Sequence, residues 1–205
     1  MLATERGLAN AEVAALVAQS GVAPLVLSEG AFRSIADTEA PPGIAAEIAI
    51  PRLRRDGATV FLEGVQDAGN VGAIVRSAAA FGAGAVILDR ACADPWSPKV
   101  LRAGMGGHFA LQITQVDALA PALEGYAGRL LCTVPRGGEP LREADLSGRI
   151  GWIFGAEGAG VSPASQAAAA ERVTIPLTAG TESLNVAAAA AICLYEAASR
   201  PAAGS

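Results

Sequence analysis

Two residues in the first half of the chain could bind an anionic ligand. Asn70 stands where a helix is expected to begin, and Arg76 follows six positions later in DAGNVGAIVRSAAAFG. Backbone N–H groups at a helix start favour an anion, and a guanidinium can bind a phosphate through two hydrogen bonds. Gly64 and Gly69 have P-loop spacing, but Asn70-Val71 replaces the lysine and hydroxyl residue, which disfavours an NTPase. A capped helix with a solvated arginine fits the same spacing, and the pattern alone leaves both interpretations open.

Two loops nearer the C-terminus lack bulky side chains and follow apolar runs. The first, residues 155–160 (GAEGAG), carries Glu157 at its centre. The second follows the run 173–177 and leads to Ser183 and Asn185, where an alanine-rich helix begins. Ligands of open α/β sheets bind at loops that follow strands, and glycines let backbone groups approach a ligand closely. We expect these loops to hold a nucleotide-like cofactor, although a tight turn and a simple helix cap remain alternatives for each stretch alone.

Strands and helices alternate from residue 58 onward. Continuous apolar strands that alternate with helices indicate a parallel sheet covered on both faces, so the expected fold class is α/β. Asp117 and Ser162 are expected to cap helices. Strands are expected at 59–62, 84–88, 109–114, 129–134, 151–154 and 172–175, and helices at 70–81, 98–106, 117–126, 163–170 and 184–199.

The first 50 residues form a short, partial N-terminal α/β segment. A helix at 12–18, a strand at 23–27, a helical turn at 31–36 and a strand at 44–50 are expected there. This is too little apolar surface for an independent core. The sequence therefore predicts two parts, a partial segment at 1–50 and a full domain at 51–205.

Composition excludes several classes of protein. Hydrophobic residues make up 52% of the 205 residues, but no apolar run approaches 18 residues, so no membrane span is expected. The N-terminus lacks the basic start and apolar block of a secretory signal. Three widely spaced cysteines favour a reducing cytoplasm over a disulfide framework. His108 is the sole histidine, which argues against a metal site, and it lacks the nucleophile elbow of a hydrolase triad.

Basic residues are sparse, and the net charge of −5 argues against a protein that coats nucleic acid. A local patch remains possible. Arg52, Arg54 and Arg55 form the densest basic cluster, and Lys99 and Arg102 lie in a second stretch. Both groups are candidate RNA contacts, and a solvated face is the alternative for the second.

In their order and spacing, these stretches resemble the SpoU (TrmH-like) family of RNA ribose 2'-O-methyltransferases, in the SPOUT class. DAGNVGAIVRSAAAFG matches the first motif, with the family asparagine and arginine at Asn70 and Arg76. FGAEGAGVS matches the second motif, with the family glutamate at Glu157. IPLTAGTESLNVAAAAAICLYE matches the third motif, with the family serine and asparagine at Ser183 and Asn185.

The resemblance covers residues 58–198 and implies further features. It implies a C-terminal deep trefoil knot in the parallel sheet and a homodimer with sites at the subunit interface. It implies S-adenosylmethionine as the cofactor, bound in the knot in a bent form. The residues expected to contact it are Thr133, Val134, Pro135, Gly155, Ile175 and Leu184. Most family members carry an N-terminal RNA-binding domain, and residues 28–51 resemble its last part.

The implied reaction moves a methyl group from a sulfonium to a ribose 2'-hydroxyl by in-line displacement. We expect Arg76 to grip the adjacent phosphate, because a guanidinium is always charged and is a poor base. That phosphate or a water molecule would take the proton. Glu157 would orient Arg76 or the ribose, while Asn70, Ser183 and Asn185 position the nucleotide.

RNA is the expected partner because only RNA offers the 2'-hydroxyl. Structured ribosomal RNA is slightly favoured over tRNA. Two alternatives remain at this stage: a SPOUT enzyme that methylates an RNA base, and a non-catalytic RNA-binding or assembly factor with the same fold.

Overall fold

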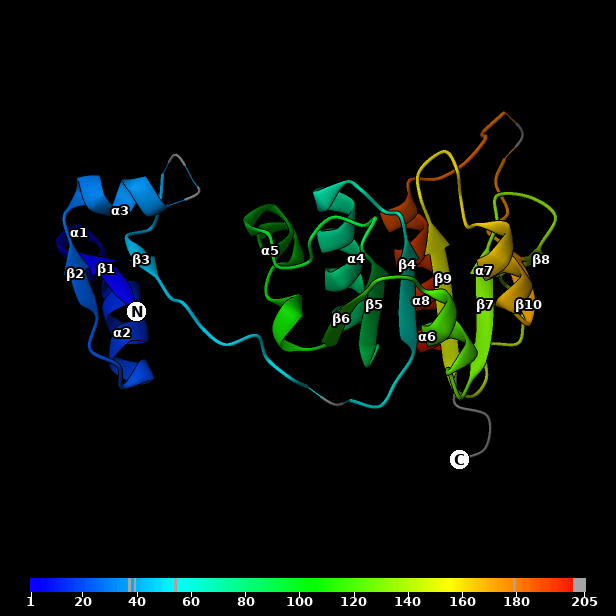
Figure 1. Ribbon diagram of the computed structural model, residues 1–205, viewed down its shortest axis with the longest axis horizontal. Helices are drawn as coiled ribbons and strands as arrows, with labels where there is room; N and C mark the ends of the chain where they lie inside the picture. Colours follow the sequence, from blue (N-terminus) through cyan, green and yellow to red (C-terminus); the bar gives the residue numbers. More distant parts are fainter. Residues whose placement is uncertain (37, 39, 54, 179, 201–205) are drawn as a thin grey trace. The chain divides into compact units, whose positions relative to one another are not determined.

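The computed structural model describes residues 1–36, 38, 40–53, 55–178 and 180–200. The chain forms two compact units, Met1–Ile50 and Pro51–Ser205 (Figure 1). The first unit is a three-stranded sheet in the order β2-β1-β3, in which β2 runs parallel and β3 antiparallel to β1. Its elements are β1 (Leu2–Thr4), α1 (Glu5–Leu8), α2 (Ala11–Ser20), β2 (Leu25–Leu27), α3 (Glu29–Ile35) and β3 (Ile44–Ala45).

The core of the first unit is small, and Ala3, Val13 and Phe32 are its buried hydrophobic residues among those described. The strand expected at 44–50 was wrong beyond Ala45, because residues 46–50 are exposed and pair with no strand. The strand β1 was not predicted. Three residues are too few to show the alternating pattern that marks a strand.

The second unit contains a seven-stranded sheet in the order β6-β5-β4-β9-β7-β10-β8, with every pairing parallel. This confirms the α/β class with a parallel sheet. The strands are β4 (Thr59–Glu63), β5 (Ala85–Asp89), β6 (Gln112–Val116), β7 (Arg129–Thr133), β8 (Glu139–Pro140), β9 (Ile150–Gly155) and β10 (Glu171–Thr174). The helices are α4 (Ala68–Ala80), α5 (Pro98–Gly104), α6 (Ala120–Glu124), α7 (Pro163–Ala168) and α8 (Val186–Ser199), with a 3-10 turn η1 (Gly107–Phe109).

Helices cover both faces of this sheet (Figure 1). Side chains of a strand point alternately to its two faces, and the central strand β4 shows the pattern clearly. Val60 and Leu62 pack with Ile74 of α4 in the larger core, which also contains residues of α5 and α8. Phe61 packs with Leu123 of α6 in a second core on the other face, which also contains residues of β7 and β9. The first four residues of β4, Thr59 to Leu62, are buried, which explains their mostly apolar sequence.

Two expectations at helix and strand starts were wrong. The strand expected from Phe109 begins at Gln112, because residues 107–109 form the turn η1. Asp117 does not cap α6, since its carboxylate accepts a hydrogen bond from the Arg90 guanidinium instead. The expected cap at Ser162 is confirmed, because its hydroxyl accepts a hydrogen bond from the Ser165 amide at the start of α7.

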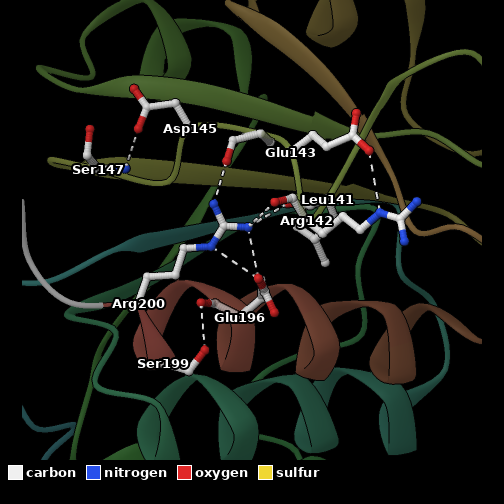
Figure 2. Close-up of polar contacts among 9 residues, drawn as sticks. Leu141, Arg142, Glu143, Asp145, Ser147, Glu196, Ser199 and Arg200 are labelled. Carbon is white, nitrogen blue, oxygen red and sulfur yellow. Dashed lines mark hydrogen bonds and ion pairs between the residues drawn. The ribbon is translucent and has the colours of Figure 1, made fainter.

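Arg200 ties the end of α8 to the segment that follows β8 (Figure 2). Its guanidinium donates to the backbone carbonyls of Ala144 at 2.6 Å, Leu141 at 3.0 Å and Arg142 at 3.0 Å. It also donates to the Glu196 carboxylate one turn earlier, at 2.8 and 3.1 Å. A single side chain thus fixes the last helix against the edge of the sheet.

No helix within the described residues is long and apolar enough to cross a membrane.

Candidate functional site

A cavity opens at the carboxyl ends of β7, β9 and β10, between the loops that follow these strands. Figure 1 shows the loops after β9 and β10 at the same end of the sheet. The six residues expected to contact a cofactor all line it: Thr133, Val134, Pro135, Gly155, Ile175 and Leu184. The remaining lining residues are Phe154, Ala156, Glu157, Gly158, Gly160, Val173, Leu177, Ser183, Val186 and Ala189.

The glycine loop after β9 folds back on itself with no room for side chains at its base. A Cβ atom added at Gly155 would lie 2.1 Å from the backbone carbon of Gly160. The Gly160 amide donates to the Ala156 carbonyl at 2.8 Å and closes the loop. Gly158 and Gly160 have φ values of +87° and +68°, which favour glycine. The loop therefore presents bare backbone to the cavity.

Three polar residues from three separate motifs meet at the cavity mouth, and we call Asn70, Glu157 and Asn185 the amide–carboxylate cluster. Oε1 of Glu157 accepts hydrogen bonds from Nδ2 of Asn70 and from Nδ2 of Asn185, the latter at 3.3 Å. Nδ2 of Asn185 also donates to Oδ1 of Asn70 at 3.0 Å. Oε2 of Glu157 accepts no hydrogen bond from the described part of the chain. The cluster therefore leaves one exposed carboxylate oxygen available to a ligand.

Asn185 has a second role as the N-cap of α8. Its Oδ1 accepts from the amides of Ala187 at 2.9 Å and Ala188 at 3.3 Å, so only Nδ2 is left for the cluster. The helix cap that the sequence left open as an alternative for this stretch is therefore Asn185, whereas Ser183 lies in the cavity wall ahead of the helix. Asn70 does not cap its helix either, because Asp67 holds that position.

Arg76 lies apart from the cluster. It is six residues beyond Asn70 on α4, roughly 9 Å further along the helix axis at about 1.5 Å per residue. Its side chain is exposed and makes no ion pair or hydrogen bond with any described residue. From the sequence, Glu157 could orient either Arg76 or the ribose. Within one chain of the structure, Glu157 does not pair with Arg76.

The candidate RNA contacts that the structure describes are exposed and lie away from the cavity lining. Arg52 and Arg55 lie in the segment before β4, and Lys99 and Arg102 lie on α5. Arg54 lies outside the described residues. None of the four described cations lines the cavity.

The cysteines and the histidine stay out of the site. Burial raises the pKa of the Cys92 and Cys193 thiols to about 12 and that of Cys132 to about 11, so none is a reactive thiolate. His108 is 1% exposed, and burial lowers its pKa. Nε2 of His108 lies 2.8 Å from the Pro95 carbonyl. Across the described ranges, no group of three or more His, Cys, Asp or Glu side chains could hold a metal ion.

One polar residue beside the site was missed by the sequence reasoning. Glu63 ends β4, and its carboxylate accepts hydrogen bonds from Ser162 and Ser165 beyond the glycine loop. Its partners are about 100 positions away in sequence, so no local pattern could have revealed them. A carboxylate at the end of a buried strand was the one available signal.

A cavity at the carboxyl ends of parallel strands, walled by apolar side chains and bare backbone, defines an α/β protein that binds a nucleotide-like cofactor. The profile of the SpoU rRNA Methylase family matches residues 57–195. The chain belongs to this family.

Individual relatives agree with the family match. The chain is 37% identical over 190 residues to an uncharacterized tRNA/rRNA methyltransferase of Synechocystis, covering 89% of this chain and 69% of that protein. It is 34% identical over 181 residues to the 23S rRNA (guanosine(2553)-2'-O)-methyltransferase RlmP of Bacillus subtilis, covering 86% and 73%. The AdoMet-bound rRNA methyltransferase from Sinorhizobium meliloti superposes with a TM-score of 0.72 at 28% identity, covering 91% and 75%.

Proposed function

We propose that this protein is an S-adenosylmethionine-dependent methyltransferase that modifies a ribose 2'-hydroxyl in structured RNA. One observation carries the proposal: three distant motifs place the amide–carboxylate cluster at the mouth of a cavity walled by bare backbone. The relative RlmP is named as a 23S rRNA 2'-O-methyltransferase. Ribosomal RNA is therefore the substrate that we favour over tRNA.

The cavity residues suit S-adenosylmethionine. Val134, Ile175 and Leu184 supply apolar walls for a flat ring, and pockets of this kind use a few backbone groups to orient a ligand. The loop around Gly155 supplies those groups, because no side chain can stand between it and Gly160. When bound, this cofactor supplies a methyl group on a positively charged sulfonium, which is already a strong electrophile.

The chain must then hold the ribose hydroxyl in line with the methyl group. Such positioning can supply several kcal/mol. Glu157 would accept a hydrogen bond from a ribose hydroxyl at Oε2, because its other oxygen is occupied by Asn70 and Asn185. The two amides fix the carboxylate, and Ser183 in the cavity wall would contact the nucleotide.

Arg76 would grip the phosphate next to the target ribose, and that phosphate or a water molecule would take the proton. A guanidinium binds phosphate through paired hydrogen bonds and stays charged at all working pH values. The side chain is exposed and makes no ion pair with the described residues, so it is available for this contact.

A homodimer would bring Arg76 of the partner subunit to the site, because Arg76 does not reach Glu157 in its own chain. The elements that flank α4 expose large apolar side chains suited to such an interface: Leu101, Met105, Phe109, Ile192 and Tyr195. Analytical ultracentrifugation tests this part, and a monomer at micromolar concentration would contradict it.

Three further features belong to the same proposal. The C-terminal part would thread a deep trefoil knot around the cavity, a path supported by β7 lying between the later strands β9 and β10. Pro51–Ser205 would be the catalytic domain, and Met1–Ile50 a partial module of the RNA-binding type. Three cysteines without disulfides and an RNA substrate support a cytoplasmic location.

A radiolabelled-methyl assay on ribosomal RNA and on tRNA tests the activity, and mass spectrometry of the digested RNA locates the methyl group. We expect a 2'-O-methylated nucleoside from ribosomal RNA. A methyl group on a base would make the protein a base methyltransferase. Cofactor binding without transfer to either RNA would make it a binding or assembly factor.

Replacing Arg76 should distinguish the contribution of this residue to methyl transfer from any contribution to cofactor binding. Arg76→Ala should lower methyl transfer by at least about a hundredfold, an effect of about 2.7 kcal/mol on the transition state. The Kd for S-adenosylmethionine should change less than about twofold, because Arg76 does not line the cavity. Calorimetric titration and the transfer assay measure the two values. Equal losses in both would contradict the assigned role.

A further inference from the structure

Glu63 holds both ends of the glycine loop that carries Glu157. In the sheet, Glu63 of β4 pairs with Gly155 of β9, the residue at which the loop begins. Where the loop ends, the Glu63 carboxylate accepts hydrogen bonds from the amide of Ser162 at 2.8 Å and its hydroxyl at 2.7 Å. The hydroxyl of Ser165 donates to the same carboxylate at 2.9 Å. One residue thus anchors the loop through its backbone at one end and its side chain at the other.

Only the tip of the loop projects beyond these anchors. Ala156 and Gly160 are bridged across the base, so Glu157, Gly158 and Ala159 form the tip. The tip carries the carboxylate of the amide–carboxylate cluster and part of the cavity wall. A shift of the anchored ends would therefore move both together.

We propose that Glu63 is a positioning residue for methyl transfer, which sets the place of the glycine loop and hence of Glu157. Glu63 does not line the cavity. It acts on the reaction through Ser162, Ser165 and the loop between. This inference rests on the proposed function, because its readouts are cofactor binding and methyl transfer.

The donors around Glu63 indicate which substitution should be tolerated. The Ser162 amide can only donate, whereas the hydroxyls of Ser162 and Ser165 can donate or accept. A glutamine at position 63 could accept from the Ser162 amide and donate to a hydroxyl that has rotated. An alanine would leave three donors without an acceptor in a partly buried place, which is the costly outcome.

Other contacts should keep α7 and the rest of the domain folded when Glu63 is removed. Val161 is buried, and the side chain of Gln166 donates to its carbonyl at 2.8 Å. The Ser162 hydroxyl still caps α7 through the Ser165 amide. We therefore expect the Glu63→Ala variant to fold, with the glycine loop displaced and the rest of the domain intact.

The test compares Glu63→Ala and Glu63→Gln in the 205-residue chain by calorimetric titration with S-adenosylmethionine and by steady-state methyl transfer. Glu63→Ala should raise the cofactor Kd at least about tenfold, which equals about 1.4 kcal/mol, and lower kcat by a similar factor or more. The KM for RNA should change little. Glu63→Gln should restore both values to within about threefold of wild type.

Asp145→Ala is the matched control. Like Glu63, Asp145 is a carboxylate that accepts hydrogen bonds from another segment and from a loop amide. Its donors are Arg129, at the start of β7, and the Ser147 amide, and it does not line the cavity. The Asp145→Ala variant should have a lower melting temperature and an unchanged cofactor Kd. If Glu63→Ala lowers only the melting temperature, Glu63 is merely structural and the inference fails. If the wild-type protein binds no S-adenosylmethionine, the proposed function itself fails.

Discussion

Asn185 performs two tasks with opposite ends of one amide group. Oδ1 caps α8, and Nδ2 donates to Asn70 and Glu157. Substitutions can therefore separate the two tasks. Aspartate keeps an oxygen for the cap, and a negative charge at a helix N-terminus is favourable. The same substitution removes the donor and places a second carboxylate beside Glu157.

Asn185→Asp should therefore keep the thermal stability of wild type and lower methyl transfer at least about tenfold. Asn185→Ala should lose activity to a similar degree and also lose about 1 kcal/mol of stability with the cap. Denaturant unfolding and the transfer assay measure both effects. Loss of activity only in the alanine variant would assign Asn185 to the helix cap and remove it from the site.

The buried imidazole of His108 should make stability depend on pH. Nε2 hydrogen-bonds the Pro95 carbonyl, while Nδ1 is buried with no partner among the described residues. Protonation would place a charged N–H where nothing accepts it, which agrees with a pKa below the ordinary 6.5.

Because the folded-state pKa is the lower one, the unfolded chain binds the extra proton first. Stability should be full above pH 6.5 and should fall as the pH drops through 6.5 toward the folded-state pKa. Thermal unfolding between pH 7.5 and 5.5 tests this expectation. Glutamine cannot titrate, so His108→Gln should flatten the dependence of the melting temperature on pH. If the slope of that dependence is unchanged in the variant, other titratable groups cause it.

Individual site residues could be predicted from sequence only where a motif marked them. Asn70, Glu157 and Asn185 each lie in a motif that the sequence displays, and in the structure they meet. The N-cap role of Asn185 was missed, because Ser183 is an equally good capping residue and only the path of the backbone decides between them. The role of Glu63 in anchoring the loop was missed, because hydrogen bonds between segments that are distant in sequence produce no local sequence pattern.

At the scale of elements, Arg200 links the end of α8 to the segment that follows β8. Its guanidinium donates hydrogen bonds to three backbone carbonyls and to the Glu196 carboxylate (Figure 2). Arg200→Ala should destabilise the second unit by about 1–3 kcal/mol, the cost of leaving such acceptors unsatisfied. Arg200→Lys should recover only part, because a single ammonium lacks the fork of donors.

Arg142 supplies the control for this change. Its side chain is exposed and, among the described residues, pairs only with the neighbouring exposed Glu143. Arg142→Ala should therefore change stability by less than about 0.5 kcal/mol. Guanidinium denaturation compares the three variants with wild type. Equal stability of Arg200→Ala and Arg142→Ala would show that the tie contributes nothing.

The regular elements of the second unit were predictable because each carries its own pattern. Buried strands such as β4 and β9 are continuous apolar runs, and they were placed to within two residues. The two-residue strand β8 was missed, because Glu139–Pro140 joins the sheet only through its pairing with β10. The order of the strands likewise depends on non-local pairing that periodicity does not encode.

At the scale of the whole molecule, the two units should be separable. Although we propose that the first 50 residues are a partial module of the RNA-binding type, they contain two arginines against six carboxylates, so they add little attraction for phosphates. A chain of residues 51–205 should fold and bind S-adenosylmethionine with a Kd within about twofold of the full chain. Its RNA affinity, measured by filter binding at fixed salt, should fall less than about threefold.

A large loss of RNA affinity on truncation would instead make the first unit the main means of RNA capture. Substitution of Arg52 and Arg55 in the full chain is the companion measurement, because it removes cations while both units remain.

Two of the three hydrogen bonds of the amide–carboxylate cluster join residues 87 and 115 positions apart. A chain that is only partly folded therefore possesses no rudimentary form of the site, and non-local pairings of this kind form slowly. Any compound that occupies the cavity binds the finished fold alone and withdraws it from the unfolding equilibrium. The supply of methyl donor in a cell would then govern how long each copy of this protein survives, as well as how fast it works.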